Sequence, residues 1–181
     1  MNYDFNNASV KPPIDQESLS MFDSNHKAPL GKSLNELLLK FNGSSFDEYV
    51  IQAPNDKKWL CYTMHEKYFR VYSFFSLDEI QDRIESITEH CLDYEIDVES
   101  PLFFLNSMIP FTEVDGFNPL CIVTKGDDEG KIYLVEWYFH HQNNGSLPFP
   151  RQLVADSFEE FLSMLSLADE DVRYKKAISS Y

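Results

Sequence analysis

The stretch "PLCIVTKGDDEGKIYLVEWYF", residues 119–139, contains two apolar segments on either side of a polar turn. Residues 119–124 and 131–139 are rich in β-branched and aromatic side chains, which favour strands. The residues between them, "KGDDEG" at 125–130, are polar and contain glycine, a composition typical of a hairpin turn. The stretch therefore predicts an antiparallel hairpin, and we expect Trp137 in its second strand to be largely buried.

One position in the second strand breaks the apolar pattern. Successive side chains of a strand point to opposite faces. The predicted faces carry Tyr133, Val135, Trp137 and Phe139 on one side and Ile132, Leu134, Glu136 and Tyr138 on the other. Glu136 therefore interrupts an apolar row. Either it has a cross-strand partner such as a Lys or a Tyr hydroxyl, or it lies at a partly exposed edge, or it lines a binding groove.

Three phrases elsewhere in the chain share one pattern. They are "SLNELLLKF" from Ser33, "SLDEIQDRI" from Ser76 and "SFEEFLSML" from Ser157. Each has Glu three residues after Ser, as in the capping box of a helix N-terminus, and continues with apolar residues at helical spacing. They predict three helices, the first ending at Asn42-Gly43. The segments between them do not repeat, which excludes a solenoid. The phrases also resemble acidic-directed kinase sites, but capping already accounts for each serine.

The remaining segments have weaker secondary-structure patterns. Residues 14–22 predict a short helix, and 59–64 and 68–75 predict two strands joined by "HEK". Residues 101–111 are apolar but interrupted by Asn106 and Pro110, so they predict a short strand or an extended entry into the sheet. Residues 143–153 predict a loop.

The order of these elements predicts an α+β fold. Adjacent hairpins favour a single, mostly antiparallel central sheet with flanking helices. The polar start of the chain, which closes on Pro12-Pro13, predicts a flexible N-terminal tail over residues 1–13. We expect residues 14–181 to form one domain.

The charge of the chain restricts its partners. The 181 residues carry a formal net charge of −15. This charge argues against binding nucleic acid or an anionic membrane surface, and it allows electrostatic steering towards a basic protein. Solubility alone is the other explanation. No apolar run approaches the roughly 20 residues that span a membrane. Three cysteines without a C-x-x-C pair, and no secretory signal, favour the cytoplasm.

Candidate chemistry in the sequence is sparse. Cys61 and His65 would share one face of a strand, and His140 and His141 would point to opposite faces, so neither pair forms a metal site by itself. The turn "DDEG" lacks the ligand spacing of a calcium loop. There is no phosphate-binding glycine loop and no nucleophile elbow. The sequence therefore predicts no catalytic residue, metal or cofactor.

Acidic residues are the candidates for partner binding. Some lie in the second predicted helix and its exit, where a solvated face and a docking surface are both consistent with the pattern. Others are expected in loops around the central hairpin. The predicted partner-binding residues are Glu113, Asp115, Asp127, Asp128 and Glu129, with Glu136 and Trp137 as a possible acid-plus-aromatic anchor.

Three motifs resemble the SUKH superfamily, the Smi/Knr-type proteins. "LLLKFNG" is similar to the family's early helix, "IPFTEVDGFNPLCIVTKGDDEGKIYLVEW" to its central stretch, and "ADSFEEFLSML" to its closing helix. The resemblance covers roughly residues 30–167, in the family's order. Two features differ: "NGSSF" replaces a richer glycine run, and "EWYFHH" replaces an Asp-His pair.

The resemblance implies an α+β fold and a function without catalysis. Bacterial members of the superfamily bind and neutralise a cognate toxin, often a nuclease, and eukaryotic relatives are regulatory interaction proteins of cell-wall synthesis. The leading hypothesis is a cytoplasmic immunity-type protein whose acidic surface covers the active site or substrate groove of a basic toxin. The alternative is a regulatory scaffold that binds an endogenous protein or a small ligand, and an enzyme is the third. The sequence indicates neither the identity of the toxin nor an oligomeric state.

Overall fold

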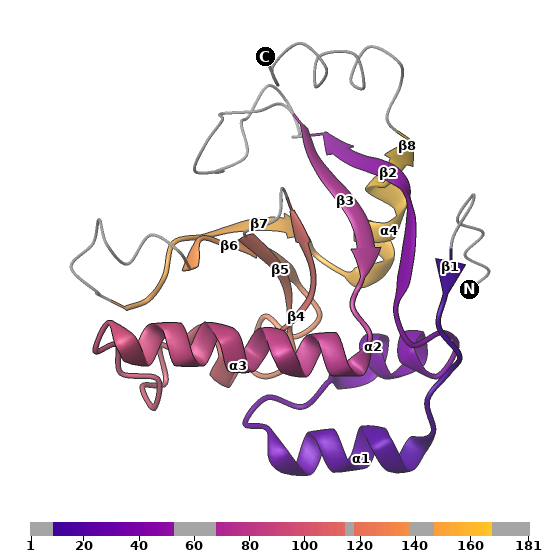
Figure 1. Ribbon diagram of the computed structural model, residues 1–181. Coiled ribbons are helices and arrows are strands. Elements are labelled where there is room, and N and C mark those ends of the chain that lie inside the picture. The colour runs from indigo at the N-terminus through magenta and orange to yellow at the C-terminus, as the bar shows by residue number, and fades with distance from the viewer. Residues whose placement is uncertain (1–8, 53–67, 115–117, 138–146, 168–181) are drawn as a thin grey trace.

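The computed structural model describes residues 9–52, 68–114, 118–137 and 147–167, and these residues form an α+β fold (Figure 1). The helices are α1 (Gln16–Asn25), α2 (Gly31–Leu38), α3 (Leu77–Asp93) and α4 (Phe158–Met164), with a short 3-10 helix at Phe104–Asn106. The strands are β1 (Ser9–Val10), β2 (Ser44–Gln52), β3 (Tyr68–Phe74), β4 (Met108–Val114), β5 (Asn118–Val123), β6 (Ile132–Val135), β7 (Arg151–Ala155) and β8 (Ser166–Leu167).

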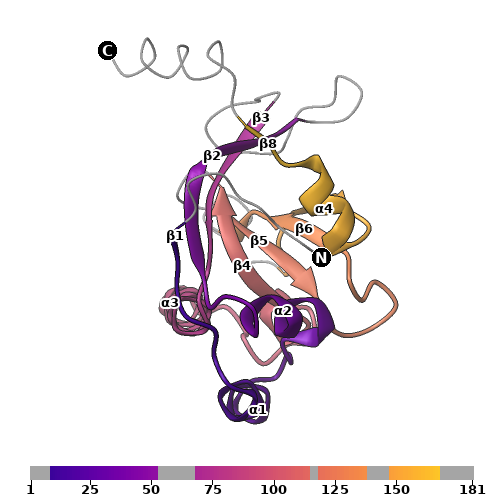
Figure 2. The same cartoon turned by 90° about the vertical axis from the view of Figure 1, so that its right-hand side faces the viewer.

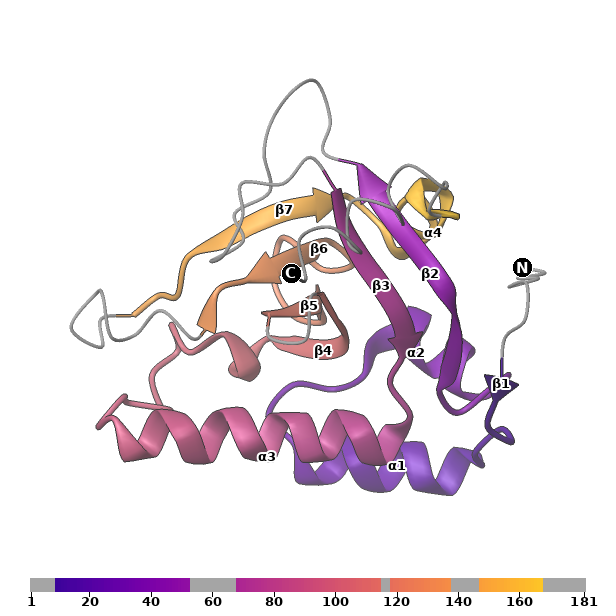
Figure 3. The ribbon, with the colours of Figure 1, turned by 45° about the horizontal axis from the view of Figure 1, so that its top comes forward.

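All eight strands belong to one antiparallel sheet, as the sequence predicted. The strands follow one another across the sheet in chain order from β1 to β7 (Figure 3). The short strand β8 pairs with β2. Among the described residues, no helix is long and apolar enough to cross a membrane.

The middle of the sheet is buried on both faces. Every residue of β5 is buried. Leu120 and Ile122 belong to a core cluster with residues of α1, α2 and α4, whereas Cys121 and Val123 belong to a second cluster with Ile87 of α3 and residues 96–105. Figure 2 shows α4 and α3 on opposite sides of β4 and β5. The sheet therefore separates two cores.

The predicted hairpin is confirmed. β5 pairs with β6, with Leu120 opposite Leu134 and Ile122 opposite Ile132, and the amide of Gly130 donates to the carbonyl of Val123. β6 ends at Val135, before the predicted limit of residue 139. Residues 138 and 139 lie outside the described residues.

Two of the three predicted helix starts are confirmed. Ser76 is the N-cap of α3 with both bonds of the capping box. Ser157 is the N-cap of α4, although the carboxylate of Glu160 accepts from the amide of Asp156 instead of from Ser157. The third prediction is wrong, because α2 begins at Gly31 and Ser33 lies inside the helix.

The earlier start of α2 has a tertiary cause. Leu30 is fully buried, and its amide donates to Asp23 Oδ1. These contacts fix the chain just before Gly31, so the helix begins ahead of the serine. The helix also ends at Leu38 rather than at Asn42-Gly43.

Some of the other sequence predictions are confirmed and some need correction. Residues 101–111 form the 3-10 helix and then enter β4, where the pairing register shifts between Pro110 and Thr112. β7 lies in the predicted loop 143–153 and beyond it, and β2 was not predicted. The short helix predicted at 14–22 is α1, and the strand predicted at 68–75 is β3. The strand predicted at 59–64 lies outside the described residues.

The predicted N-terminal tail is in contact with the domain over part of its length. Ser9 and Val10 pair with β2. The amide of Lys11 donates to the carbonyl of Gly43, and its ammonium group contacts Ser76 Oγ at 3.1 Å. Ser9 and Val10 are therefore part of the sheet, and Lys11 is hydrogen-bonded to the residues beside it.

Asn42 and Gly43, just before β2, contact the residues at the start of α3. Asn42 Oδ1 accepts from the amide of Leu77 at 2.8 Å. Gly43 has φ +86°, and a Cβ placed there would lie 2.7 Å from the backbone nitrogen of Ser76. Only glycine allows this close approach of two backbones.

We predict that the caps contribute unequally to stability. Ser76→Ala and Ser157→Ala should each lower the free energy of unfolding by about 1 kcal/mol, because each leaves a helix amide without its acceptor. Ser33→Ala is the matched control and should change it by less than about 0.5 kcal/mol. Urea unfolding followed by circular dichroism measures all three. A loss at Ser33 equal to that at Ser76 would contradict this assignment of the caps.

We also predict that two glycines with similar φ angles, Gly43 and Gly126, differ in their tolerance of alanine. Gly126 has φ +92°, and a Cβ there would meet nothing within 4 Å. Gly126→Ala should therefore cost only the conformational strain, about 1–2 kcal/mol. Gly43→Ala adds a backbone collision and should cost about 2–5 kcal/mol in total. Thermal and urea unfolding compare the two variants, and equal losses would show that the approach to Ser76 is not tight.

Candidate functional site

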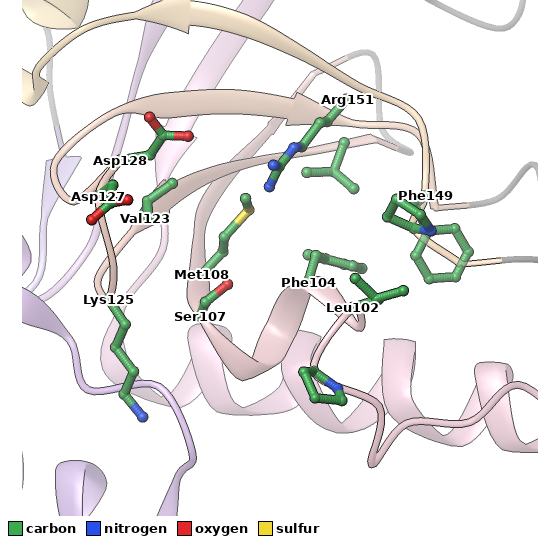
Figure 4. Close-up of a pocket in the computed structure, with 13 residues that line it drawn as sticks. Leu102, Phe104, Ser107, Met108, Val123, Lys125, Asp127, Asp128, Phe149 and Arg151 are labelled. Carbon is green, nitrogen blue, oxygen red and sulfur yellow. The ribbon is translucent and has the colours of Figure 1, made fainter.

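A cavity of about 290 Å³ opens beside the turn of the β5–β6 hairpin (Figure 4). Its walls come from three parts of the chain: residues 101–108 before and at the start of β4, the hairpin, and residues 148–151 leading into β7. The lining residues are Pro101, Leu102, Phe104, Ser107, Met108, Val123, Lys125, Asp127, Asp128, Val135, Pro148, Phe149 and Arg151.

The floor of the cavity is apolar. Met108, Val123 and Val135 are buried members of the second core, the one that α3 covers. Phe104 and Phe149 pack edge to face with ring centroids 5.7 Å apart. Leu102, also in the lining, is 56% exposed. The floor is thus a surface on which an apolar group can lose its contact with water.

One rim of the cavity is an ordered polar cluster around Asp128. Its carboxylate accepts from Lys131 Nζ at 2.6 Å and from the hydroxyl of Tyr133 at 3.2 Å. The hydrogen bond from Lys131, supported by the charge of that ammonium group, holds the pKa of Asp128 below its usual value. Arg151 lies over the ring of Tyr133 at 5.0 Å. Asp128 is therefore engaged within the chain.

Asp127 and Glu129 lie on the same turn and are exposed. Among the described residues, neither carboxylate has a hydrogen-bond or ion-pair partner. The ammonium group of Lys125 donates to the carbonyl of Lys27, and in Figure 4 its side chain runs away from Asp127. The turn therefore presents two carboxylates that the chain does not neutralise.

Glu113 does not lie in a loop as predicted. It lies in β4 and forms an ion pair with Arg83 of α3. Both side chains are less than one third exposed, so this pair connects the helix to the sheet. Asp115 falls outside the described residues.

Glu136 and Trp137 are both buried. Trp137 is 7% exposed, which confirms its predicted burial, and the His90 ring meets it edge-on at 5.1 Å. The amide of Glu136 donates to the carbonyl of Pro150. Its side chain is 9% exposed, and burial raises the pKa of its carboxyl. The predicted cross-strand Lys or Tyr partner is not found among the described residues. Glu136 and Trp137 are therefore buried inside the fold, whereas the acids of the turn are exposed to solvent.

A second group of carboxylates lies along α3 and the segment after it. The exposed members are Asp78, Glu79, Asp82, Glu85, Glu89, Asp93, Glu95, Asp97 and Glu99. Two of them form ion pairs, Glu79 with Lys11 and Glu99 with Lys27. Glu85 accepts a hydrogen bond from Gln81, and Asp97 accepts one from the amide of Glu99. The side chains of Leu92 and Tyr94, which lie between these carboxylates in the sequence, are exposed as well. The charge of the chain is therefore spread over α3 as well as the hairpin turn.

Sequence reasoning missed the opposite wall of the cavity. Phe149 and Arg151 follow a segment that reads as a loop, and their position depends on the pairing of β7 with β6. The only local signal was the sequence "PFPR", in which an aromatic residue lies between two prolines and a basic residue follows them. Within the described residues, no group of three His, Cys, Asp or Glu side chains could hold a metal ion. The Cys61–His65 and His140–His141 pairs lie outside those residues.

Comparison with known protein families assigns most of the chain to one family. The model of the SMI1 / KNR4 family (SUKH-1) matches residues 13–164, which is most of the chain. The match includes the hairpin, the cavity and all four helices. No curated protein matches the chain.

We predict that Glu136→Gln stabilises the protein at neutral pH. The raised pKa means that the folded chain keeps this proton to a higher pH than the unfolded chain. Ionisation of Glu136 therefore costs stability as the pH rises from the unfolded pKa, about 4.3, through the folded value. The glutamine variant avoids this cost.

Urea unfolding at pH 7 and at pH 3 tests this expectation. The variant should have the higher free energy of unfolding at pH 7, and the difference should shrink at pH 3, where both side chains are neutral. Glu129→Gln, at an exposed position, is the control and should have little effect at either pH. A variant less stable than the wild type at pH 7 would mean that a cation stabilises the Glu136 carboxylate.

Proposed function

The chain belongs to the SMI1/KNR4 family (SUKH-1), and from this premise we propose that it is an immunity-type protein that binds and neutralises a cognate toxin. The family match over residues 13–164 carries the proposal, because membership supports an immunity or regulatory role in general. In the specific form proposed here, the chain acts in the cytoplasm without catalysis. Its partner is a basic toxin, such as a nuclease.

The charge of the chain supports a basic partner. The net charge is −15, and exposed carboxylates lie on the hairpin turn and along α3. A nuclease groove is built to accept phosphates, so a surface of carboxylates can occupy it and exclude the substrate. Neutralisation would then need only tight binding over the groove.

Within this surface, the turn residues have different roles. Asp127 and Glu129 are exposed and available to a partner, while Asp128 is held by Lys131 and Tyr133. Glu113 is held by Arg83. We therefore propose Asp127 and Glu129 as the steering charges, with Asp128 and Glu113 maintaining the shape of the surface. Glu136 and Trp137 support it from inside the fold.

A regulatory scaffold is the second candidate, and the cavity favours it. A volume of about 290 Å³ with an apolar floor and polar rim is near the lower end of the range for small-molecule sites. The context of the gene separates the two functions, because a toxin gene beside it favours immunity. A ligand that copurifies with the chain would favour the scaffold.

The direct test is protection of cells. A toxin encoded beside this gene is expressed in a sensitive host with and without the chain, and growth is measured. Wild-type chain should restore growth and should block the toxin in a purified assay. Normal chain levels with no protection and no binding would contradict the immunity function.

We predict that the turn charges act on the rate of association. The double variant Asp127→Asn, Glu129→Gln removes two negative charges and keeps the contacts of Asp128. Association with the toxin should slow by up to about tenfold, since steering by charge changes association rates by such factors. The effect should be larger at 0.01 M salt, where the screening length is about 30 Å, than at 0.15 M.

Stopped-flow kinetics at the two salt concentrations measures this effect. Glu17→Gln, Glu159→Gln on α1 and α4 removes the same charge on elements that pack against the other core, and this variant is the matched control. Equal association rates for the wild type and the turn variant at both salts would mean that the turn is only solvated.

A further inference from the structure

The face of the sheet that α3 covers is left open near β7. Arg151 lies opposite Val135 and Leu153 opposite Tyr133 in the pairing of β6 with β7. Opposite residues of an antiparallel pair lie on the same face. Val135 belongs to the second core and Tyr133 packs against it, so Arg151 and Leu153 are on that face as well. Yet Leu153 is 44% exposed and Arg151 is exposed.

This open part of the face carries the apolar Leu153 and the charged Arg151, and it borders the cavity because Arg151 is also in the cavity lining. Leu102 in the cavity wall is 56% exposed, and Met108 and Val123 form the floor. An exposed apolar surface with a polar rim is typical of an interaction site. The volume of about 290 Å³ is enough for one large side chain and is small for a drug-sized molecule.

The charges at the rim of the cavity indicate which kind of group a ligand would carry beside its apolar side chain. Lys125 is engaged by the carbonyl of Lys27. Arg151 contributes to the low pKa of Asp128, so these two charges offset each other in part. Asp127 is the lining carboxylate without a partner among the described residues. A cation beside the apolar group would therefore be complementary to this rim.

We propose that the cavity is the docking pocket for a peptide segment of the protein partner, one that presents a large apolar side chain next to a lysine or arginine. This inference rests on the proposed function. The apolar side chain lies on Met108, Val123 and Phe104, and the cation pairs with Asp127. The guanidinium group of Arg151, which points into the cavity in Figure 4, donates to carbonyl oxygens of the peptide backbone.

The test uses the full chain with labelled methyl groups and a terminally blocked peptide, acetyl-Gly-Lys-Leu-Lys-Gly-amide. Peptide is added at 0.01 M salt, and methyl shifts are followed by NMR. Met108, Val123 and Val135 should shift with saturation, while Leu37 and Met164 in the other core should not. Replacing the peptide leucine with serine should weaken binding by about tenfold or more. The serine peptide lacks the favourable free energy that leucine gains when its side chain moves from water into the pocket.

Two variants of the chain separate the pocket from general charge attraction. Asp127→Lys and Glu129→Lys make the same charge change on the same exposed turn, but only Asp127 lines the cavity. Asp127→Lys should raise the Kd about fivefold, because it removes both the general attraction of the turn and the contact with the cation. Glu129→Lys weakens only the general attraction and should raise the Kd about twofold. Equal effects of the two variants would overturn the proposal, as would shifts confined to the other core.

Free leucine and the toxin complete the test. If leucine alone shifts the same methyl groups as strongly as the peptide, the pocket is a small-molecule site and the proposal is wrong. Asp127→Lys should also weaken binding of the toxin more than Glu129→Lys. Full protection by the chain with equal toxin affinity for both variants would retain the immunity function and exclude this pocket as the docking site.

Discussion

The burial of β5 on both faces is the constraint on which the fold depends. Apolar side chains alternate along this strand between two cores, so each face of the sheet needs its own cover. Helices α1, α2 and α4 with Ile80 of α3 supply one cover. The rest of α3, from Ile87 on, supplies the other together with residues 96–105. The elements that cover this second face do not extend over β7, and the cavity lies at their edge. The candidate site is thus a consequence of how the sheet is covered, with the hairpin turn at its rim.

Two sets of polar contacts hold α3 in place. At its start, Ser76 caps the helix, Asn42 Oδ1 accepts from Leu77, and Gly43 lies against the backbone of Ser76. Further along, Arg83 pairs with Glu113 of β4 and lies over the ring of Phe75 at 5.8 Å. These contacts connect the helix to the sheet at points distant in the sequence. They keep the second core closed beneath the cavity and leave the acidic side of α3 facing water.

Local patterns predicted the parts of the fold that depend on neighbouring residues. The capping of α3 and α4 and the β5–β6 hairpin follow from short-range hydrogen bonding and turn chemistry. The start of α2 was not predictable in this way, because the burial of Leu30 and its bond to Asp23 are tertiary contacts. β7 is short and partly exposed, which weakens its strand signal. The acids of the turn were found from the sequence, but the pairing of Glu113 with Arg83 and the wall at Phe149 and Arg151 require the folded sheet.

The central claim is that a protein partner contacts the side of the sheet that carries the hairpin turn and the cavity. Amide hydrogen exchange of the chain, alone and in complex with its toxin, tests this claim directly because it reports on every segment at once. The account predicts slower exchange in the complex at residues 101–108, 124–131 and 148–153, with α1 and α2 unchanged. Slower exchange confined to α1, α2 and α4 would contradict it.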